Sequence, residues 1–364
     1  MNVYVCSTVR HLLFALCRAS YYRDEQHHIL FFADYQRASL ADWQLAELPG
    51  NCRLYELSRA RFRRELEQSI GGRLSYQLAR GLLSAPAWLR APVIATLAES
   101  APDLARALQS ALPFSLWLFN ERNRMARLFR LLTPDFNIIE DGESNYLEYA
   151  LPWWKGLPRR LRGRPSHYRC LGDDPRCREI WVVYPERLPP LIRSKGREIC
   201  FLTTPAAVDI IRKVMGANRL PRIMAHSVIL ATQPLDGMAS MSVQDKQTIY
   251  ETIVSVLASQ GREVILKLHP AENPADYDIL KGRVVPAPMK VPVEALILSA
   301  SAPPLLLSVS SSAGLGFERF CTRIKLIENN DFATLRHWAK QPDALRACLS
   351  QNLPSAHGDS VNAQ

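Results

Sequence analysis

Several common features are missing from this chain of 364 residues, and each absence excludes a class of protein. The eight cysteines form no Cys-x-x-Cys pair, and the spacing of Cys170 and Cys177 is unusual for zinc, so we expect free thiols in a reducing compartment. The longest apolar stretch, residues 111–119, contains a proline and is far shorter than the roughly 20 residues of a membrane-spanning helix. Arg10 and His11 interrupt any apolar core of a secretory signal, which favours a cytoplasmic location.

Acidic residues are also scarce relative to basic ones. The chain has 45 Lys and Arg against 35 Asp and Glu, a formal net charge of +10. This excess favours an anionic partner, such as a nucleic acid, a phospholipid headgroup, a nucleotide-activated substrate or an acidic glycan. A nucleic-acid-binding protein ranks lowest among these, because no RNP-like, helix-turn-helix or zinc-finger pattern is present.

What is present is a regular alternation of strand-like and helical segments. Hydrophobic residues make up 48% of the chain, enough for buried cores, and the length predicts about two domains. The alternation indicates βαβ units with parallel sheets. Strands are predicted at residues 3–6, 28–32, 52–55, 136–139, 179–184 and 198–202, with a mostly helical stretch over 59–132 broken near its prolines. A second unit is predicted from strands at 227–232, 263–268 and 323–327, a serine-rich strand from Leu305, and a helix over 243–259.

We therefore predict an α/β protein that is GT-B-like, with two Rossmann-like domains and a central cleft. Residues 1–185 would form the N-terminal, acceptor-side domain and residues 195–345 the C-terminal, nucleotide-sugar-binding domain. Residues 346–364 would form a solvated tail. Fold analogy is weak support for a function, so the residues must carry that argument.

Polar residues follow three of the predicted strands. Ligands of open α/β sheets bind at the carboxyl ends of strands. An acid pair, an imidazole and a hydroxyl cluster suit the transfer of a group away from a phosphate. The three segments are Glu140-Asp141-Gly142, His269-Pro270 and Ser310-Ser311-Ser312.

The acid pair is a candidate for general base catalysis. Gly142 permits the sharp turn that frees both carboxylates. Because adjacent acids repel, the pKa of either Glu140 or Asp141 is expected to rise, which suits a base toward a hydroxyl. The same three residues are also common in ordinary surface turns.

The other two segments are candidates for phosphate binding. Pro270 fixes the backbone after His269, whose imidazole would stabilise a departing phosphate, although an ordinary loop histidine fits the same pattern. The serine run is expected to cap a helix whose N-terminus attracts an anion, and it also fits an ordinary N-cap.

In this order, the acid pair with its glycine, the His-Pro motif and the serine run resemble the motifs of bacterial sialyltransferases. The pattern is most similar to family 52 glycosyltransferases, known for lipooligosaccharide sialyltransferases, and to the related polysialyltransferases. The stretch Gln233-Pro234-Leu235 is similar to one that precedes the nucleotide-binding half in these families. The resemblance extends over most of residues 1–330.

This resemblance implies an inverting sialyltransferase that uses CMP-sialic acid. Glu140 would deprotonate the acceptor hydroxyl, with Asp141 orienting it or sharing the role, and His269 would act as acid or electrostatic stabiliser at the nucleotide phosphate. The implied acceptor is a bacterial surface glycan, namely lipopolysaccharide, lipooligosaccharide or capsule, and we expect this acceptor to be lipid-linked. Transfer of Kdo or a hexose by the same machinery stays open. The implied donor-binding residues are Gly142, Gln233, Pro270, Ser310, Ser311 and Ser312.

Two further segments bear on metals and membranes. Asp276-Tyr277-Asp278 has the Asp-x-Asp spacing that binds divalent metal in many other glycosyltransferases, but it is expected on a solvated helix face, so we predict no metal and no cofactor. Residues 153–164 are basic and rich in tryptophan. They would contact anionic headgroups at the inner face of the inner membrane, or form a basic linker at the cleft rim.

Overall fold

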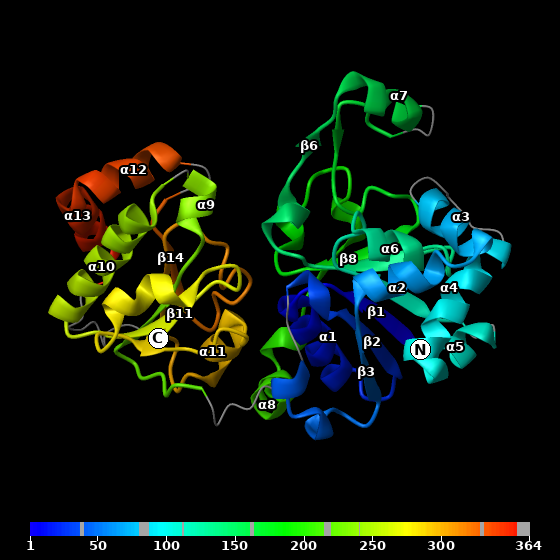
Figure 1. Cartoon of the computed structure of the whole chain (residues 1–364), viewed down its shortest axis with the longest axis horizontal. Coiled ribbons are helices and arrows are strands. Elements are labelled where there is room, and N and C mark those ends of the chain that lie inside the picture. The colour runs from blue at the N-terminus through cyan, green and yellow to red at the C-terminus, as the bar shows by residue number, and fades with distance from the viewer. Residues whose placement is uncertain are drawn as a thin grey trace. The chain divides into compact units, whose positions relative to one another are not determined.

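The computed structural model describes residues 1–36, 40–79, 87–110, 113–160, 164–214, 220–239, 241–327 and 331–354. The chain divides into two compact units, Met1–Val214 and Met215–Gln364, and each has its own parallel sheet (Figure 1).

The first unit is built on a seven-stranded parallel sheet in the order β3-β2-β1-β4-β5-β8-β9. The chain runs outward from β1 to one edge and then continues on the other side of β1. The strand order therefore reverses between β1 and β4, where doubly wound sheets bind their ligands. The strands are β1 (Asn2–Cys6), β2 (His27–Phe32), β3 (Cys52–Leu57), β4 (Ser115–Leu118), β5 (Phe136–Ile139), β8 (Cys177–Val182) and β9 (Gly196–Glu198).

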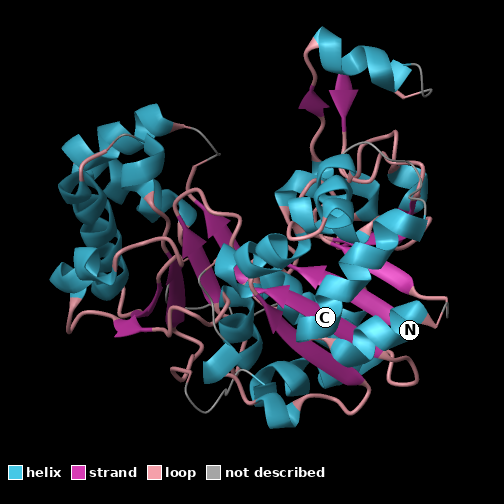
Figure 2. Cartoon of the chain, turned by 45° about the vertical axis from the view of Figure 1, so that its right-hand side comes forward, coloured by secondary structure: helices cyan, strands magenta, loops and turns pink. Residues whose placement is uncertain are grey.

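Helices cover both faces of this sheet (Figure 2). β1 and β2 are buried along their whole length, as expected of central strands in a parallel sheet. Val3 and Val5 pack in one core with side chains from the helices between β3 and β4. The helices of the unit are α1 (Val9–Tyr21), α2 (Arg59–Leu66), α3 (Ile70–Leu78), α4 (Ala87–Ser100), α5 (Pro102–Gln109), α6 (Arg124–Phe129), α7 (Trp153–Arg160) and α8 (Pro205–Val214). A two-stranded antiparallel pair, β6 (Tyr149–Ala150) and β7 (Tyr168–Arg169), flanks α7.

The predicted, mostly helical stretch over 59–132 is wrong near its end, where β4 lies. A four-residue apolar strand is too short to show a period of two and cannot be distinguished from a buried helical segment. Pro92 lies inside α4 rather than ending it. In the segment 198–202, predicted as a strand, β9 ends at Glu198 and Phe201–Thr203 forms a 3-10 turn.

The predicted domain boundary between residues 185 and 195 lies too early. β9 pairs with β8 in the first sheet, and α8 packs against α1, so both belong to the first unit. The predicted tail also begins too early, because α13 (Pro342–Asn352) packs its buried Leu345 and Leu349 into the second core. Residues 355–364 of the predicted tail lie outside the described residues.

The second unit repeats the same topology on a smaller scale. Its parallel sheet has the order β12-β11-β10-β13-β14, so the strand order reverses between β10 and β13. The strands are β10 (Ser227–Ala231), β11 (Glu263–Lys267), β12 (Val285–Pro286), β13 (Leu305–Ser308) and β14 (Thr322–Lys325). The helices are α9 (Leu235–Ala239), α10 (Val243–Ser259), α11 (Val293–Ser299), α12 (Phe332–Lys340) and α13.

The helix over 243–259 is confirmed, and Ser242 and Asp245 form a capping box at its start. The prediction of an α/β protein with two Rossmann-like domains is also confirmed, while the central cleft stays a prediction.

Candidate active site

Polar side chains gather at the carboxyl ends of β1, β4 and β5 in the first unit. Ser7 lies between β1 and α1, and Arg10 and His11 lie in the first turn of α1. Asn120 follows β4, and β5 runs directly into the acid pair. These strands are neighbours in the sheet, and β1 and β4 flank the reversal of strand order. The local topology thus brings together residues more than 100 positions apart.

Glu140 is completely buried, and both of its carboxylate oxygens have partners. Arg10 Nη2 donates to Oε1 at 3.2 Å, and the backbone N–H of Val183 donates to Oε2 at 2.9 Å. The Tyr146 hydroxyl also donates to Oε2. The Glu140 carboxylate thus connects the end of β5 to the residue after β8 and to the 3-10 turn that contains Tyr146. It has no surface exposed to an acceptor.

Asp141 is the accessible acid of the pair, with 21% of its side chain exposed. His11 Nε2 lies 2.6 Å from Oδ1, and Asn120 Nδ2 donates to Oδ2 at 3.1 Å. The backbone N–H of Ser7 donates to His11 Nδ1, which leaves the ring proton on Nε2, facing Asp141. Burial alone would raise the pKa of Asp141, but His11, Asn120 and Arg10 together hold it below its ordinary value. Asp141 is therefore ionised at neutral pH and fixed in orientation.

Gly142 has the backbone conformation expected from the sequence. Its φ of 130° is one that residues with a side chain rarely adopt, and it precedes the 3-10 turn Glu143–Tyr146. Asn145 in this turn accepts the backbone N–H of Asp141 at 2.8 Å. The turn thus holds both acids; the predicted donor contact of Gly142 stays a prediction.

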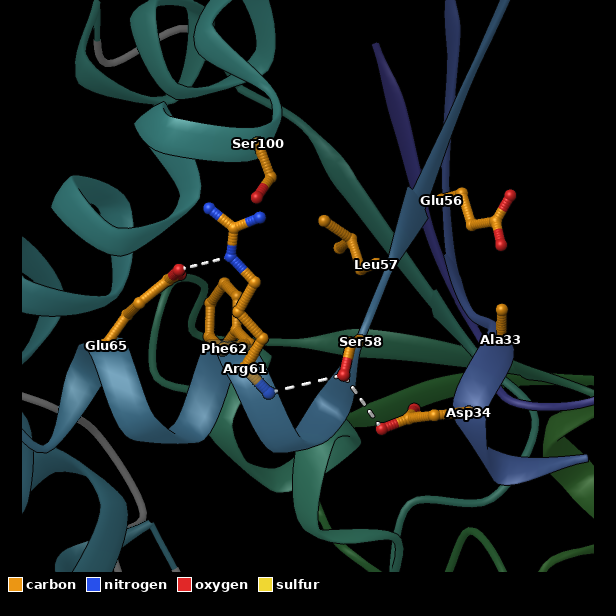
Figure 3. A pocket seen from close by; sticks show the side chains of 9 residues that line it. All are labelled: Ala33, Asp34, Glu56, Leu57, Ser58, Arg61, Phe62, Glu65 and Ser100. Carbon is orange, nitrogen blue, oxygen red and sulfur yellow. Dashed lines mark hydrogen bonds and ion pairs between the residues drawn. The ribbon is translucent and has the colours of Figure 1, made fainter. Parts of the chain in front are cut away.

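A pocket of about 490 Å³ opens at the carboxyl ends of β2 and β3 (Figure 3). Asp34 accepts the Ser58 hydroxyl and the first backbone N–H groups of α2, while Arg61 pairs with Glu65 at 2.5 Å. Asp34 and Arg61 thus bond to neighbouring residues at the pocket wall. None of the residues predicted for the site lines this pocket.

In the second unit, Gln233 and Ser310 join the ends of β10 and β13. Gln233 Nε2 donates to Ser310 Oγ at 2.5 Å, and the Ser310 backbone N–H donates to Gln233 Oε1 at 3.0 Å. Both side chains are buried. This reciprocal pair lies where the strand order reverses and fixes the start of the serine run.

Ser311 and Ser312 are more accessible than Ser310, with Ser311 half-buried and Ser312 exposed. The helix predicted after the serine run is wrong, because Ala313–Gly316 forms turns instead. Gly314 and Gly316 both have positive φ values, 71° and 87°, which no helix contains. Arg323 on β14 stabilises this loop by donating to the carbonyls of Ser311 and Ala313.

His269 is exposed just after the end of β11, and the buried carboxylate of Glu272 lies three residues further along the same turn. The His269 carbonyl accepts the backbone N–H of Glu272 at 3.0 Å, which closes a turn over Pro270. The Ala271 N–H donates to Nδ1 at 3.1 Å, which leaves Nε2 for a ligand. Desolvation at the strand end lowers the pKa of His269, and the Lys267 ammonium lowers it further against the opposing effect of Glu272.

Buried charges support the His269 loop from behind. Glu272 accepts hydrogen bonds from the hydroxyls of Thr232 and Tyr277 and from the backbone N–H of His269. Lys267 donates to the carbonyls of Leu268 and Met289, and burial lowers its pKa to about 8.

The Asp276-Tyr277-Asp278 segment forms part of a 3-10 turn rather than an α-helix. Asp276 pairs with the buried Lys246 at 2.7 Å, and Asp278 pairs with Lys281 at 2.9 Å. Within the described part of the chain, no group of three His, Cys, Asp or Glu side chains is arranged to hold a metal ion. Metal independence stays a prediction.

Three supporting residues escaped the sequence analysis: His11, Asn120 and Glu272. His11 lies three residues after Thr8, which caps α1. A histidine in the first helical turn after β1 is the sequence feature that could have identified it. Glu272 lies three residues after His269, a spacing at which a side chain returns to the backbone of a turn. Asn120 follows the strand that the sequence did not reveal.

Comparison with known families finds a similarity in the second half of the chain. Residues 202–326 match the family model described as alpha-2,8-polysialyltransferase (POLYST). This segment of the chain is therefore similar to sialyltransferases. The matched range includes Gln233, His269 and all three serines of the serine run, which agrees with the predicted resemblance to sialyltransferases, while the donor-binding role of these residues stays a prediction. The acid pair lies outside the matched range, and a comparison with curated proteins finds no match.

Solved structures with related topology include sialyltransferases. The alpha/beta-galactoside alpha-2,3-sialyltransferase of Photobacterium phosphoreum has 13% identity and a TM-score of 0.48, covering 93% of this chain and 95% of that one. The sialyltransferase of Photobacterium damsela has 12% identity and a TM-score of 0.44, covering 93% and 78%. The glycosyltransferase SnogD of Streptomyces nogalater has 13% identity and a TM-score of 0.46, covering 98% and 96%. Likeness at this level identifies neither donor nor acceptor.

Proposed function

We propose that this enzyme transfers sialic acid, with inversion, from CMP-sialic acid to a hydroxyl of a bacterial surface glycan such as lipopolysaccharide, lipooligosaccharide or capsule. The observation that carries the proposal is the polysialyltransferase match over residues 202–326, whose His-Pro and serine motifs lie at the strand ends of the second unit. Those strand ends are where a doubly wound sheet binds a nucleotide.

On the acceptor side, Asp141 is the better candidate for the general base. It is ionised and partly exposed, and His11 and Asn120 fix its orientation. Glu140, expected from the family resemblance to be the base, is buried with both oxygens engaged. Its role would be to position the loop that holds Asp141.

On the donor side, His269 Nε2 and the hydroxyls of Ser311 and Ser312 would contact the phosphate of the donor. The acceptor oxygen forms a bond to the anomeric carbon while the bond to the CMP phosphate oxygen breaks, and Asp141 takes the acceptor proton. His269 donates a hydrogen bond to the leaving phosphate and so stabilises the negative charge that develops on it. Gln233 and Ser310 would hold this loop in place.

Metal-independent transfer is part of the same proposal. CMP leaves as a monophosphate, and an imidazole with two hydroxyls can stabilise its charge without a divalent ion. We expect that a chelator leaves the rate unchanged. Loss of activity in chelator that manganese restores would contradict this part of the proposal.

Binding of free nucleotides tests the donor assignment. At about 100 times Kd, CMP would add about 2.7 kcal/mol to the free energy of unfolding, while UDP and GDP would add much less. The gain should shrink in Ser311→Ala and Ser312→Ala and persist in Ser350→Ala, an exposed serine on α13. Stabilisation by UDP and not CMP would contradict the proposal and favour a hexose donor.

A further inference from the structure

A narrow arm extends from the first unit between β5 and β8. β6 and β7 pair as its stem, and α7 forms its tip (Figures 1 and 2). Both views show α7 standing clear of the rest of its unit. A helix placed so far from a core has no folding reason to be apolar, so its composition requires another explanation.

The tip of this arm presents a large apolar surface. Trp153 is 83% exposed, Trp154 57% and Leu157 59%. At about 100° per residue these three side chains lie within roughly 100° of the helix circumference, which makes one continuous face. Gly156 marks the side of α7 that contacts the arm: a Cβ there would lie 2.0 Å from the Ser166 carbonyl oxygen, so α7 is pressed against the returning chain. The apolar face is therefore directed outward.

Cations accompany this face, and an ion-pair cluster fixes the arm. Lys155 and Arg160 are exposed on α7, and the Lys155 ammonium lies 4.7 Å from the ring centre of Trp154. Nearer the stem, Arg159 and Arg164 both pair with Asp173, at 2.7 and 3.8 Å. The two kinds of basic residue thus have different tasks, one holding α7 in orientation and the other facing outward.

We propose that α7 docks on the surface of a lipid bilayer that carries anionic headgroups. Exposed tryptophans beside Lys and Arg on a short helix match the interface between headgroups and acyl chains, where aromatic rings insert and cations meet phosphate. The formal charge of +10 favours approach to such a surface. No helix within the described residues is long and apolar enough to cross a membrane, so this contact would be peripheral. The docking does not depend on the identity of the transferred sugar.

Vesicle binding by the full chain tests this proposal. We expect binding to phosphatidylcholine vesicles only when phosphatidylglycerol is included, with a blue shift of tryptophan fluorescence on binding. Trp153→Ser with Trp154→Ser should reduce partitioning by at least about tenfold. Lys155→Glu with Arg160→Glu should do the same at low salt. The control Trp88→Ser removes a tryptophan of similar exposure, 54%, from α4 and should leave binding unchanged.

Three results would overturn the proposal. They are equal binding by the tryptophan variant, equal binding to vesicles without anionic lipid, and a lipid-free dimer in sedimentation that the tryptophan variant abolishes. The last would make the face an interface between two copies. Thermal unfolding of each variant confirms that the fold is intact. Because the readout is binding, it stays informative even if the enzyme transfers no sialic acid.

Discussion

At the scale of single residues, two adjacent carboxylates differ because of what surrounds them. Glu140 points into the sheet, where Arg10, Val183 and Tyr146 occupy its oxygens, and Asp141 points out toward His11 and Asn120. The sequence placed both acids at the end of a strand, and that expectation holds. It did not reveal which acid is accessible, because the deciding partners lie up to 130 residues away.

Substitutions that remove the charge should separate the two roles. Asp141→Asn is expected to lower kcat by roughly 10²–10⁴-fold with near-normal stability, because the amide keeps the shape but does not accept the proton. Glu140→Gln should instead lower the free energy of unfolding by about 1–3 kcal/mol, since it disturbs a buried network. Steady-state kinetics and chemical denaturation measure the two effects. Normal turnover in Asp141→Asn would reverse the assignment.

The lowered pKa of His269 gives a pH signature. A neutral imidazole must take up a proton to form its strongest contact with phosphate. Because the pKa of His269 lies below its ordinary value, CMP affinity should decrease as the pH rises through that lowered pKa. Calorimetry of wild type and His269→Gln across mildly acidic to neutral pH tests this. The variant corrects for titration of CMP itself, and identical pH profiles in the two proteins would contradict a His269–phosphate contact.

At the scale of elements, the strands and the long helix followed from local pattern, and the loops did not. β1, β5 and α10 carry buried apolar runs or a capping box that can be read directly. β4 was missed because four residues show no period. The loop after Ser310 was misread as a helix because its course depends on glycine conformations and on Arg323 from β14.

The serine loop should be sensitive to substitution at Gly314. Its φ is 71°, and a Cβ there would lie 2.2 Å from Cδ2 of the fully buried Leu306. Gly314→Ala should therefore cost about 2–4 kcal/mol of unfolding free energy, combining backbone strain and overpacking. Gly261→Ala is the matched control, with a φ of 70° and no heavy atom within 4 Å, and should cost about 1 kcal/mol. Equal costs would show that the Leu306 contact does not shape the loop.

At the scale of the whole molecule, each unit places its polar residues where its own strand order reverses. The order of strands around β1 is repeated around β10, and the candidate acceptor and donor residues lie at equivalent edges of the two sheets. This correspondence was only partly visible in the sequence, because the boundary lies after α8 rather than before β9. The excess of positive charge suits an anionic nucleotide sugar and a membrane surface alike.

The central proposal is transfer of sialic acid from CMP-sialic acid, with Asp141 as the base and His269 as a contact of the donor phosphate. The most direct test is to incubate wild type, Asp141→Asn and His269→Ala with CMP-sialic acid and bacterial glycan acceptors, with CMP-Kdo and UDP-hexoses in parallel, and to measure glycosylated product. The account predicts product from CMP-sialic acid with wild type, and losses of roughly 10²-fold or more in both variants. Transfer only from CMP-Kdo or a UDP-hexose, or full activity in both variants, would contradict it.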